Sequence, residues 1–350
     1  MNTLSQLVAS KVAFQELFHR GHVPAQKPFS KDLLTLDCPL EAQRICEIIR
    51  REVLQNFHKK GVVVALSGGI DSSTVAALAA RALGPERVLV LMMPEKDSSA
   101  ETLQLSQLMA EHLGVKAIHE NVSPILEASG CYRRRDEAIR LLIPEYGPDW
   151  KSKLVLPNVD SESLRIFSVV AQAPDGTQVT RPVSLEAHLG IIAATNFKQR
   201  TRKMLEYYHA DRVNYAVAGT PNRLEYDQGF FVKLGDGAAD LKPIAHLYKS
   251  QVYQLAEYLR VPDAILRRPP TTDTYSLPQT QEEFYFCLPY QKMDVVLYGK
   301  CNGYSPEEIA PEVDLSTEQV QRVFRDIDAK RRVARYLHAA AVLIEDVKQS

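Results

Sequence analysis

The chain has 350 residues, 45% of them hydrophobic and 24% charged, which is typical of a globular protein and excludes a disordered or fibrous one. Its 42 Lys and Arg residues balance 43 Asp and Glu residues, so it lacks the basic excess of a protein that coats nucleic acid, and we expect no nucleic-acid partner. The sequence predicts no transmembrane helix, and five cysteines without a Cys-x-x-Cys motif favour a reducing cytoplasm over disulfides or zinc.

Helices and strands alternate in the first third of the sequence, after an N-terminal arm that we place at residues 1–40. Apolar residues spaced three and four apart predict an amphipathic helix over 41–61. Strands that alternate with helices predict an α/β fold with a parallel sheet flanked by helices. The further predicted elements are strands over 62–67, 88–93 and 115–120 and helices over 72–83 and 100–113.

The alternation breaks over about 123–184, which we interpret as an insertion in a sheet domain of residues 41–270. Within it, Pro174-Asp175-Gly176-Thr177 predicts the turn of a β-hairpin. The arginines at 133–135 precede Asp136 and Glu137, which favours a solvated basic turn over a phosphate clamp. After the insertion, the sequence predicts a helix over 185–210, a strand over 213–219, a helix over 247–259 and a helical C-terminal region over 271–350.

The strongest functional pattern is a glycine- and serine-rich loop that joins a predicted buried strand to a predicted helix. It reads Ser67-Gly68-Gly69-Ile70-Asp71-Ser72-Ser73. The glycines leave backbone N–H groups accessible, and the helix N-terminus adds unpaired donors, so the loop is expected to bind phosphate. The Asp71 carboxylate would repel phosphate unless a cation lies between them, which indicates Mg²⁺. No lysine stands where a G-x-x-x-x-G-K-[ST] loop requires one.

In this context S-G-G-x-D-S resembles the pyrophosphate loop of the ATP pyrophosphatase family, which implies an adenine nucleotide alpha-hydrolase-like (Rossmann-like) fold. Several enzyme groups share that loop, and residues 218–252 resemble one of them, the ammonia-dependent NAD synthetases. The matching motifs are Gly219-Thr220, Glu225, Gly229-Phe230-Phe231-Val232-Lys233, Gly235-Asp236-Gly237, Asp240, Pro243-Ile244 and Lys249, with Asn196 to Arg202 upstream and Pro270 to Asp273 downstream.

The resemblance implies a ligase that amidates a carboxylate in two steps. ATP would activate deamido-NAD as an acyl-adenylate with release of pyrophosphate, and ammonia would then displace AMP to give NAD. Asp71 and Glu225 would hold Mg²⁺. ATP or its pyrophosphate would be bound by Ser67, Gly68, Gly69, Asp71, Ser72, Ser73, Thr220, Lys249 and Thr271, and the dinucleotide by Arg200, Lys233, Asp240 and Lys330.

Departures from the family pattern concern the acceptor half of the site. Leu224 stands where the family often has Ser, and Ala329 stands where it has a His. The acceptor is therefore open between deamido-NAD and another carboxylate, and a tRNA-modifying ATP pyrophosphatase and a non-catalytic nucleotide-binding regulator remain as alternatives. About forty residues before the sheet domain are too few for a glutaminase domain, which predicts free ammonia or a separate ammonia-supplying subunit. The resemblance also implies a homodimer.

Overall fold

The computed structural model describes residues 28–156, 167–271, 274–286, 288–345 and 347. Residues Lys31–Ser350 form one compact unit, and everything below concerns that unit. Among its described residues, no helix is both long and apolar enough to cross a membrane.

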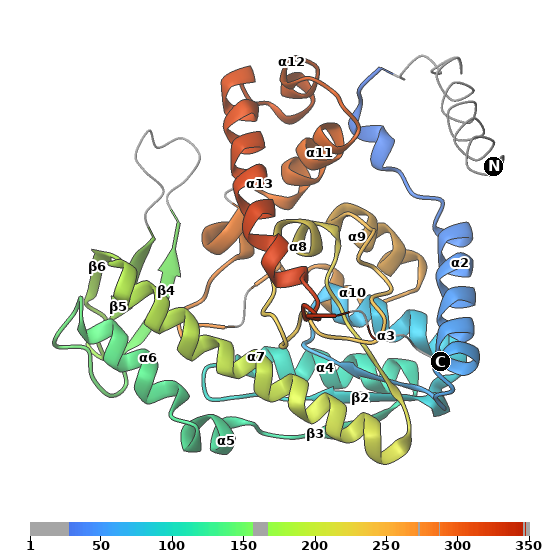
Figure 1. Ribbon diagram of the computed structural model, residues 1–350, viewed down its shortest axis with the longest axis horizontal. Coiled ribbons are helices and arrows are strands. Elements are labelled where there is room, and N and C mark those ends of the chain that lie inside the picture. The colour runs from blue at the N-terminus through green and yellow to red at the C-terminus, as the bar shows by residue number, and fades with distance from the viewer. Residues whose placement is uncertain (1–27, 157–166, 272–273, 287, 346, 348–350) are drawn as a thin grey trace, which may run out of the picture. The chain divides into compact units, whose positions relative to one another are not determined.

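The centre of the unit is a four-stranded parallel sheet in the order β3-β2-β1-β7 (Figure 1). Its strands are β1 (Val62–Ala65), β2 (Val88–Met92), β3 (Lys116–His119) and β7 (Ala216–Ala218). Val62 of β1 pairs with Val88 of β2 and with Ala216 of β7, so β1 lies in the middle of the sheet. The strands β1, β2 and β7 are mostly buried runs of valine, leucine and alanine, as expected when helices cover both faces of a parallel sheet.

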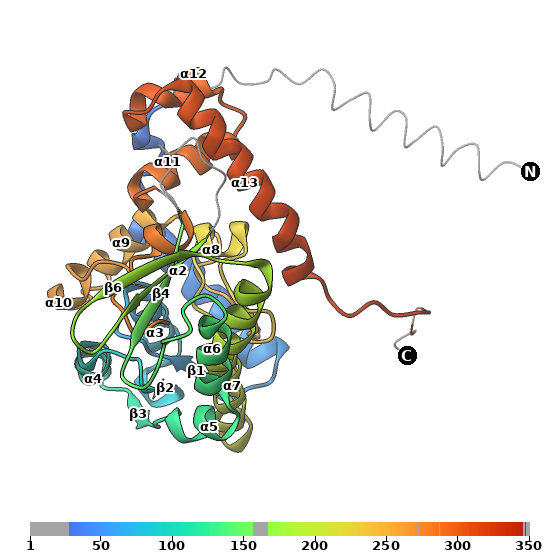
Figure 2. The ribbon, with the colours of Figure 1, turned by 90° about the vertical axis from the view of Figure 1, so that its left-hand side faces the viewer.

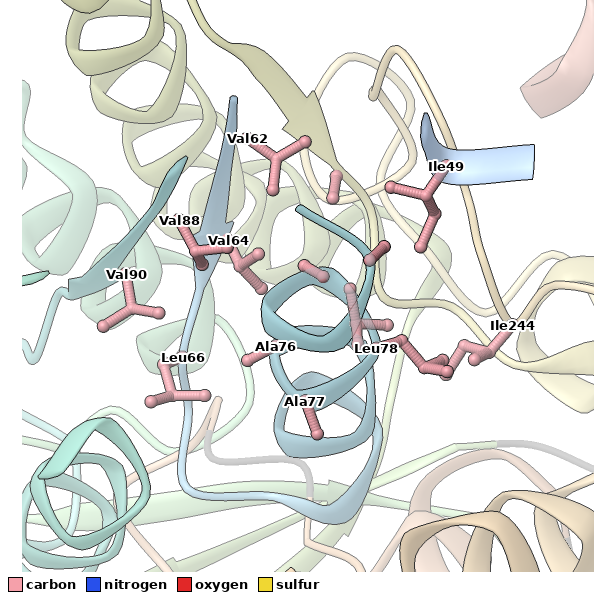
Figure 3. Close-up of a cluster of buried hydrophobic side chains, with 14 of the residues drawn as sticks. Ile49, Val62, Val64, Leu66, Ala76, Ala77, Leu78, Val88, Val90 and Ile244 are labelled. Carbon is pink, nitrogen blue, oxygen red and sulfur yellow. The ribbon is translucent and has the colours of Figure 1, made fainter. Parts of the chain in front are cut away.

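Helices cover the two faces of this sheet. On one face, Val62 and Val64 pack with α2 (Cys38–Arg50), α3 (Ile70–Leu83), α4 (Ala100–Leu113) and α9 (Lys249–Tyr258). Figure 3 shows these valines directed toward α3, whose small Ala76 allows close approach. On the other face, Val63 packs against α5 (Ser123–Ala128) and α7 (Leu185–Val213). The predicted α/β fold, with a parallel sheet flanked by helices, is therefore confirmed.

A second, antiparallel sheet lies within the predicted insertion (Figure 2). Its strands are β4 (Lys151–Val155), β5 (Ser168–Gln172) and β6 (Gln178–Pro182), in the order β4-β5-β6. The turn between β5 and β6 contains Asp175, which accepts a hydrogen bond from the Thr177 N–H, so the predicted hairpin is present. A separate core of α6 (Cys131–Arg140), α7 and this sheet includes Ile139, Leu154 and Ile191.

Helices make up most of the C-terminal region in the described residues (Figure 1). These helices and the shorter ones elsewhere are η2 (Lys31–Leu34), η3 (Arg51–Asn56), η4 (Pro85–Arg87), α8 (Arg223–Gln228), α10 (Asp263–Leu266), η5 (Glu282–Phe286), α11 (Tyr290–Cys301), α12 (Pro306–Ile309), η6 (Ala310–Val313) and α13 (Thr317–His338).

Several element boundaries differ from those predicted. The helix α2 begins at Cys38 rather than at residue 41, because the Asp37 side chain caps it by accepting a hydrogen bond from the Leu40 N–H at 3.1 Å. It continues into the π-helical turn η3 instead of running to residue 61. The helix α7 extends to Val213, where Asn214 ends it in the left-handed conformation, so β7 starts only at Ala216.

Candidate functional site

The phosphate loop between β1 and α3 is shaped by Gly68. Its φ of +66° lies in the left-handed region, and a Cβ there would stand 2.7 Å from the Thr102 carbonyl oxygen, so only glycine fits. Gly69 then caps α3, which places Asp71 and Ser72 in the first helical turn. The Ser72 hydroxyl lies 3.2 Å from the Ser67 N–H and 3.2 Å from the Ser67 hydroxyl, which closes the loop.

A buried ionic cluster lies beside the loop. Lys249, at the first residue of α9, donates a hydrogen bond from Nζ to Oδ2 of Asp71. Asn222 donates from Nδ2 to Oδ1 of Asp71 at 3.0 Å, and its main-chain N–H donates to Oε2 of Glu225 at 3.2 Å. Gln281 donates to the other Glu225 oxygen, Oε1, at 3.1 Å. The two predicted metal carboxylates are thus held by one shared neighbour, Asn222.

The charges of this cluster are unbalanced. Burial raises the pKa of Glu225, and the nearby Asp71 carboxylate raises it further. Burial alone would lower the pKa of Lys249, but Asp71 and Glu225 outweigh that effect and the pKa is raised. Lys249 therefore stays charged and compensates one carboxylate, while the second carboxylate has no cation of its own in the described part of the chain.

The donor set fits a hard divalent cation such as Mg²⁺. Mg²⁺ is usually held by one or two carboxylates, with waters and substrate phosphates completing its coordination. Asp71 and Glu225 supply two carboxylates beside a phosphate loop, and a cation would relieve the repulsion that raises the pKa of Glu225. No group of three or more His, Cys, Asp or Glu side chains suited to a metal occurs among the described residues.

The cluster opens into a cavity of about 750 Å³. The phosphate loop, the ends of β2 and β7, α7, the 268–285 segment and α13 contribute to its wall. The sequence-predicted residues that line it are Ser67, Gly69, Asp71, Ser72, Thr220, Glu225, Lys249, Thr271 and Lys330. Gly68 and Ser73 are not part of this wall: Gly68 packs against Thr102, and Ser73 is fully buried with no hydrogen-bond partner for its hydroxyl among the described residues.

Three predicted dinucleotide-binding residues lie outside this cavity. Arg200 donates to the Lys233 carbonyl oxygen at 3.3 Å. Lys233 donates from Nζ to the carbonyl oxygens of Tyr336 and Ala339, at 2.9 and 3.0 Å, which fastens the end of α13. Asp240 accepts a hydrogen bond from the Val217 N–H at 2.7 Å and so holds the outer edge of β7.

Lys330, the fourth predicted dinucleotide-binding residue, does line the cavity. Its Nζ is held by Asp326 at 2.7 Å and by the Tyr285 carbonyl oxygen at 2.6 Å. Both partners fix the direction of the ammonium group. Lys330 therefore places a positive charge on the side of the cavity that α13 forms. It is far from the phosphate loop in the sequence.

Sequence reasoning missed several polar residues in the cavity wall or directly behind it. Asn222 and Gln281 hold the carboxylate pair, as described above. Glu206 and Asp236 are buried carboxyls whose pKa values are raised by burial, and Lys203 donates to Glu206 at 2.6 Å. Asp236 stands inside the quoted Gly-Asp-Gly motif, so a signal for it existed, whereas the others are ordinary residue types in helices and loops.

The interpretation of residues 133–135 as a solvated turn is wrong, because all three lie in the helix α6 and Arg135 is buried. Its guanidinium is buried in α6 and donates to Asp97 at 2.6 Å and to Asp136 at 2.9 Å. Lys198 of α7 also donates to Asp97, at 2.7 Å. Asp97 lies far upstream in the sequence, so the local run of charges did not reveal this pairing.

Comparisons with known proteins show the family to which the chain belongs. The NAD synthase family model matches residues 41–141 and 166–334. An NH(3)-dependent NAD(+) synthetase from Rhizobium meliloti (strain 1021) is 56% identical over 92% of this chain and 96% of its own length. A protein of the same description from Mesorhizobium japonicum is 55% identical over 90% of this chain and 99% of its own length.

Solved structures show the same fold at lower identity. An NMN synthetase from Francisella tularensis covers 88% of this chain and 99% of its own, with a TM-score of 0.62 and 22% identity. An NH3-dependent NAD synthetase from Campylobacter jejuni covers 89% of this chain and 100% of its own, with a TM-score of 0.59 and 22% identity. At such identity the likeness is one of fold.

Proposed function

The chain belongs to the NAD synthase family, and from that membership we propose that it is an ammonia-dependent ligase that converts deamido-NAD into NAD. ATP is the co-substrate, and AMP and pyrophosphate are the other products. The observation that carries the proposal is the phosphate loop with Asp71, Glu225 and Lys249 gathered at the wall of a single cavity.

The reaction explains why the site needs charge rather than a nucleophilic side chain. An oxygen of the nicotinate carboxylate attacks the α-phosphorus of ATP, the bond to the bridging oxygen breaks, and pyrophosphate leaves. Ammonia then attacks the carbonyl carbon, and AMP leaves with one of the two carboxylate oxygens. Free carboxylate would have to expel oxide, whereas AMP is a far better leaving group. The protein therefore has to position two anions and neutralise the charge between them.

The residues of the cluster divide this task. The N-terminal turn of α3 and the residues Ser67 and Ser72 line the cavity, where their N–H and hydroxyl groups would bind the departing pyrophosphate. Lys249 is held beside Asp71, where its fixed charge would stabilise negative charge as pyrophosphate separates. We propose that Asp71 and Glu225 together hold Mg²⁺ against the phosphates. That ion would supply charge neutralisation.

The second step releases one proton, because ammonia enters with three hydrogens and the amide nitrogen keeps two. Glu206 and Asp236 line the cavity, and burial raises the pKa of both carboxyls toward the range in which a carboxylate can take up a proton. We propose them as proton acceptors for the attacking nitrogen. Lys203, paired with Glu206, keeps that carboxyl in place.

The assembly is also part of the proposal. The long helix α7 exposes Leu185, Leu189, Met204 and Tyr208, at relative accessibilities of 75%, 58%, 55% and 59%. Exposed apolar side chains on one long helix suit an interface between copies of the chain. We propose a homodimer that covers this helix, and ammonia supplied free or by a separate subunit.

The test is an assay with ATP, Mg²⁺, ammonium and deamido-NAD. AMP, pyrophosphate and NAD should form in equal amounts, and the yield should be much smaller with nicotinate mononucleotide as acceptor or glutamine as nitrogen source. Pyrophosphate release with a different acid alone would retain the chemistry and overturn the acceptor. Absence of turnover with every acid would favour a non-catalytic regulator.

A further inference from the structure

The strand β4 of the small sheet lies between that sheet and a segment of the active site. The strand β4 lies in the stretch 142–165, which the NAD synthase family model leaves unmatched. One edge of β4 pairs with β5. Its other edge contacts the segment 274–286, several of whose residues line the cavity.

The contacts between β4 and this segment are numerous and of several kinds. The Ser152 N–H donates to the Ser276 hydroxyl at 2.8 Å, and the Leu277 N–H donates back to the Ser152 carbonyl oxygen at 3.2 Å. Lys153 donates from Nζ to Oε1 of Glu283 at 2.8 Å and to the Pro278 carbonyl oxygen at 3.2 Å.

Two further contacts complete this edge. The Gln279 side chain, which is buried, donates to the Leu154 carbonyl oxygen. The Leu156 N–H donates to the Glu283 carbonyl oxygen at 3.0 Å. An open strand edge normally exposes such backbone groups to solvent or to another chain. Here the segment 274–286 covers the edge instead.

The segment so held carries part of the active site. Gln281 reaches Oε1 of Glu225 at 3.1 Å. Tyr275, Phe284 and Tyr285 line the cavity. The ring centroids of Phe284 and Tyr275 lie 5.5 Å apart. A shift of this segment would therefore move a partner of Glu225 and the aromatic part of the wall together.

We infer that β4 is a positioning element for the active site: it holds the segment 274–286 so that Gln281 meets Glu225 and the aromatic rings line the acceptor part of the cavity. Lys153 and Gln279 are the side chains that make this connection, and neither lines the cavity itself. This inference rests on the proposed function for the identity of the acceptor. The connection itself does not depend on it.

The experiment compares Lys153→Met and Gln279→Leu with Lys151→Met, a matched control at an exposed lysine of the same strand. Hydrogen–deuterium exchange is followed in peptides from 274–286 and from β1, and KM and kcat are measured for deamido-NAD and ATP. Loss of a charged hydrogen bond should reduce the population of the held segment, so we expect KM for deamido-NAD to rise about three- to tenfold. Exchange in 274–286 should rise while exchange in β1 stays unchanged.

The outcomes separate the inference from the proposed function. The inference would be overturned if both variants showed the same exchange in 274–286 as Lys151→Met. It would also be overturned if exchange became faster while KM and kcat stayed unchanged. A role in stability alone would lower the melting temperature and leave KM unaltered. If the wild-type protein makes no NAD, the proposed function fails. The exchange rates and the Mg–ATP affinities of the same variants then still decide whether β4 positions the site.

Discussion

Asn222 joins the two carboxylates of the site, because its Nδ2 donates to Oδ1 of Asp71 at 3.0 Å while its main-chain N–H donates to Glu225 at 3.2 Å. Asn222 also caps α8, since its Oδ1 accepts from the Leu224 N–H at 2.9 Å. One residue therefore contributes, through its side chain and its main chain, to both the start of a helix and the spacing of a carboxylate pair. The predictions below test what that pair and the adjacent loop do.

Replacing Asp71 by Asn tests the charge of the pair with little change in volume. We expect Asp71→Asn to abolish NAD formation, because it removes charge beside the phosphates and the partner of Lys249. Far-ultraviolet circular dichroism should remain that of the wild-type protein. Turnover near the wild-type level would refute the role of Asp71 in binding the cation.

Glu225→Gln tests the pH dependence of stability. The folded-state pKa of Glu225 is raised by burial and by Asp71, so the folded protein keeps this proton to a higher pH than the unfolded chain does. Between the ordinary and the raised pKa, stability therefore falls as pH rises. In chelator and without nucleotide, Glu225→Gln should match the wild-type melting temperature near pH 5 and exceed it near pH 8. A difference that is the same at both pH values would contradict the assignment.

Lys249 and Asp71 should be strongly coupled in stability. Removing one partner of a buried ion pair costs about 3–5 kcal/mol, because the other charge is left without compensation. We expect Lys249→Met to destabilise the protein by about that amount. The double variant with Asp71→Asn should be more stable than the sum of the single effects predicts. Chemical denaturation of the four proteins measures this, and additive effects would show that the two charges do not interact.

Gly68→Ala tests the shape of the phosphate loop, with Gly114→Ala as its control. The two glycines have nearly equal φ angles, +66° and +64°, but a Cβ at Gly114 meets nothing within 4 Å. Both variants should lose about 1–2 kcal/mol from left-handed backbone strain. Gly68→Ala should lose more, because its Cβ clashes with Thr102, and it alone should raise KM for ATP. Equal effects of the two substitutions on stability and KM would contradict this account of the loop.

The phosphate loop and the alternation of strands and helices could be predicted from the sequence, because each is formed by contiguous residues. Ser67 to Ser73 are contiguous, and buried strands bounded by glycine are readable as short apolar runs. Glu225 and Lys249 came only from the family motifs. Glu225 and Lys249 lie near Asp71 because β1 and β7 are neighbours in the sheet. The carboxyl ends of these two strands therefore lie at one edge of the sheet.

Other parts of the site depend on contacts between distant segments. The spacing of Asn222 and Glu225 predicts a capping box. The contact of Asn222 with Asp71, on a neighbouring part of the sheet, cannot be predicted from the sequence. Gln281 meets Glu225 because β4 holds its segment in place, and no pattern in either segment indicates the other. The motif positions of Arg200 and Lys233 predict substrate contact, which stays a prediction, and the contact of Lys233 with the end of α13 is indicated by neither segment alone.

The central claim is that the acceptor carboxylate is activated as its AMP ester at this loop. The most direct measurement uses deamido-NAD with both carboxylate oxygens labelled with ¹⁸O, turned over with ATP, Mg²⁺ and ammonium. Mass spectrometry should find one ¹⁸O in the AMP and one in the amide of NAD, because AMP leaves with a carboxylate oxygen. Label in pyrophosphate or inorganic phosphate, with none in AMP, would contradict the claim.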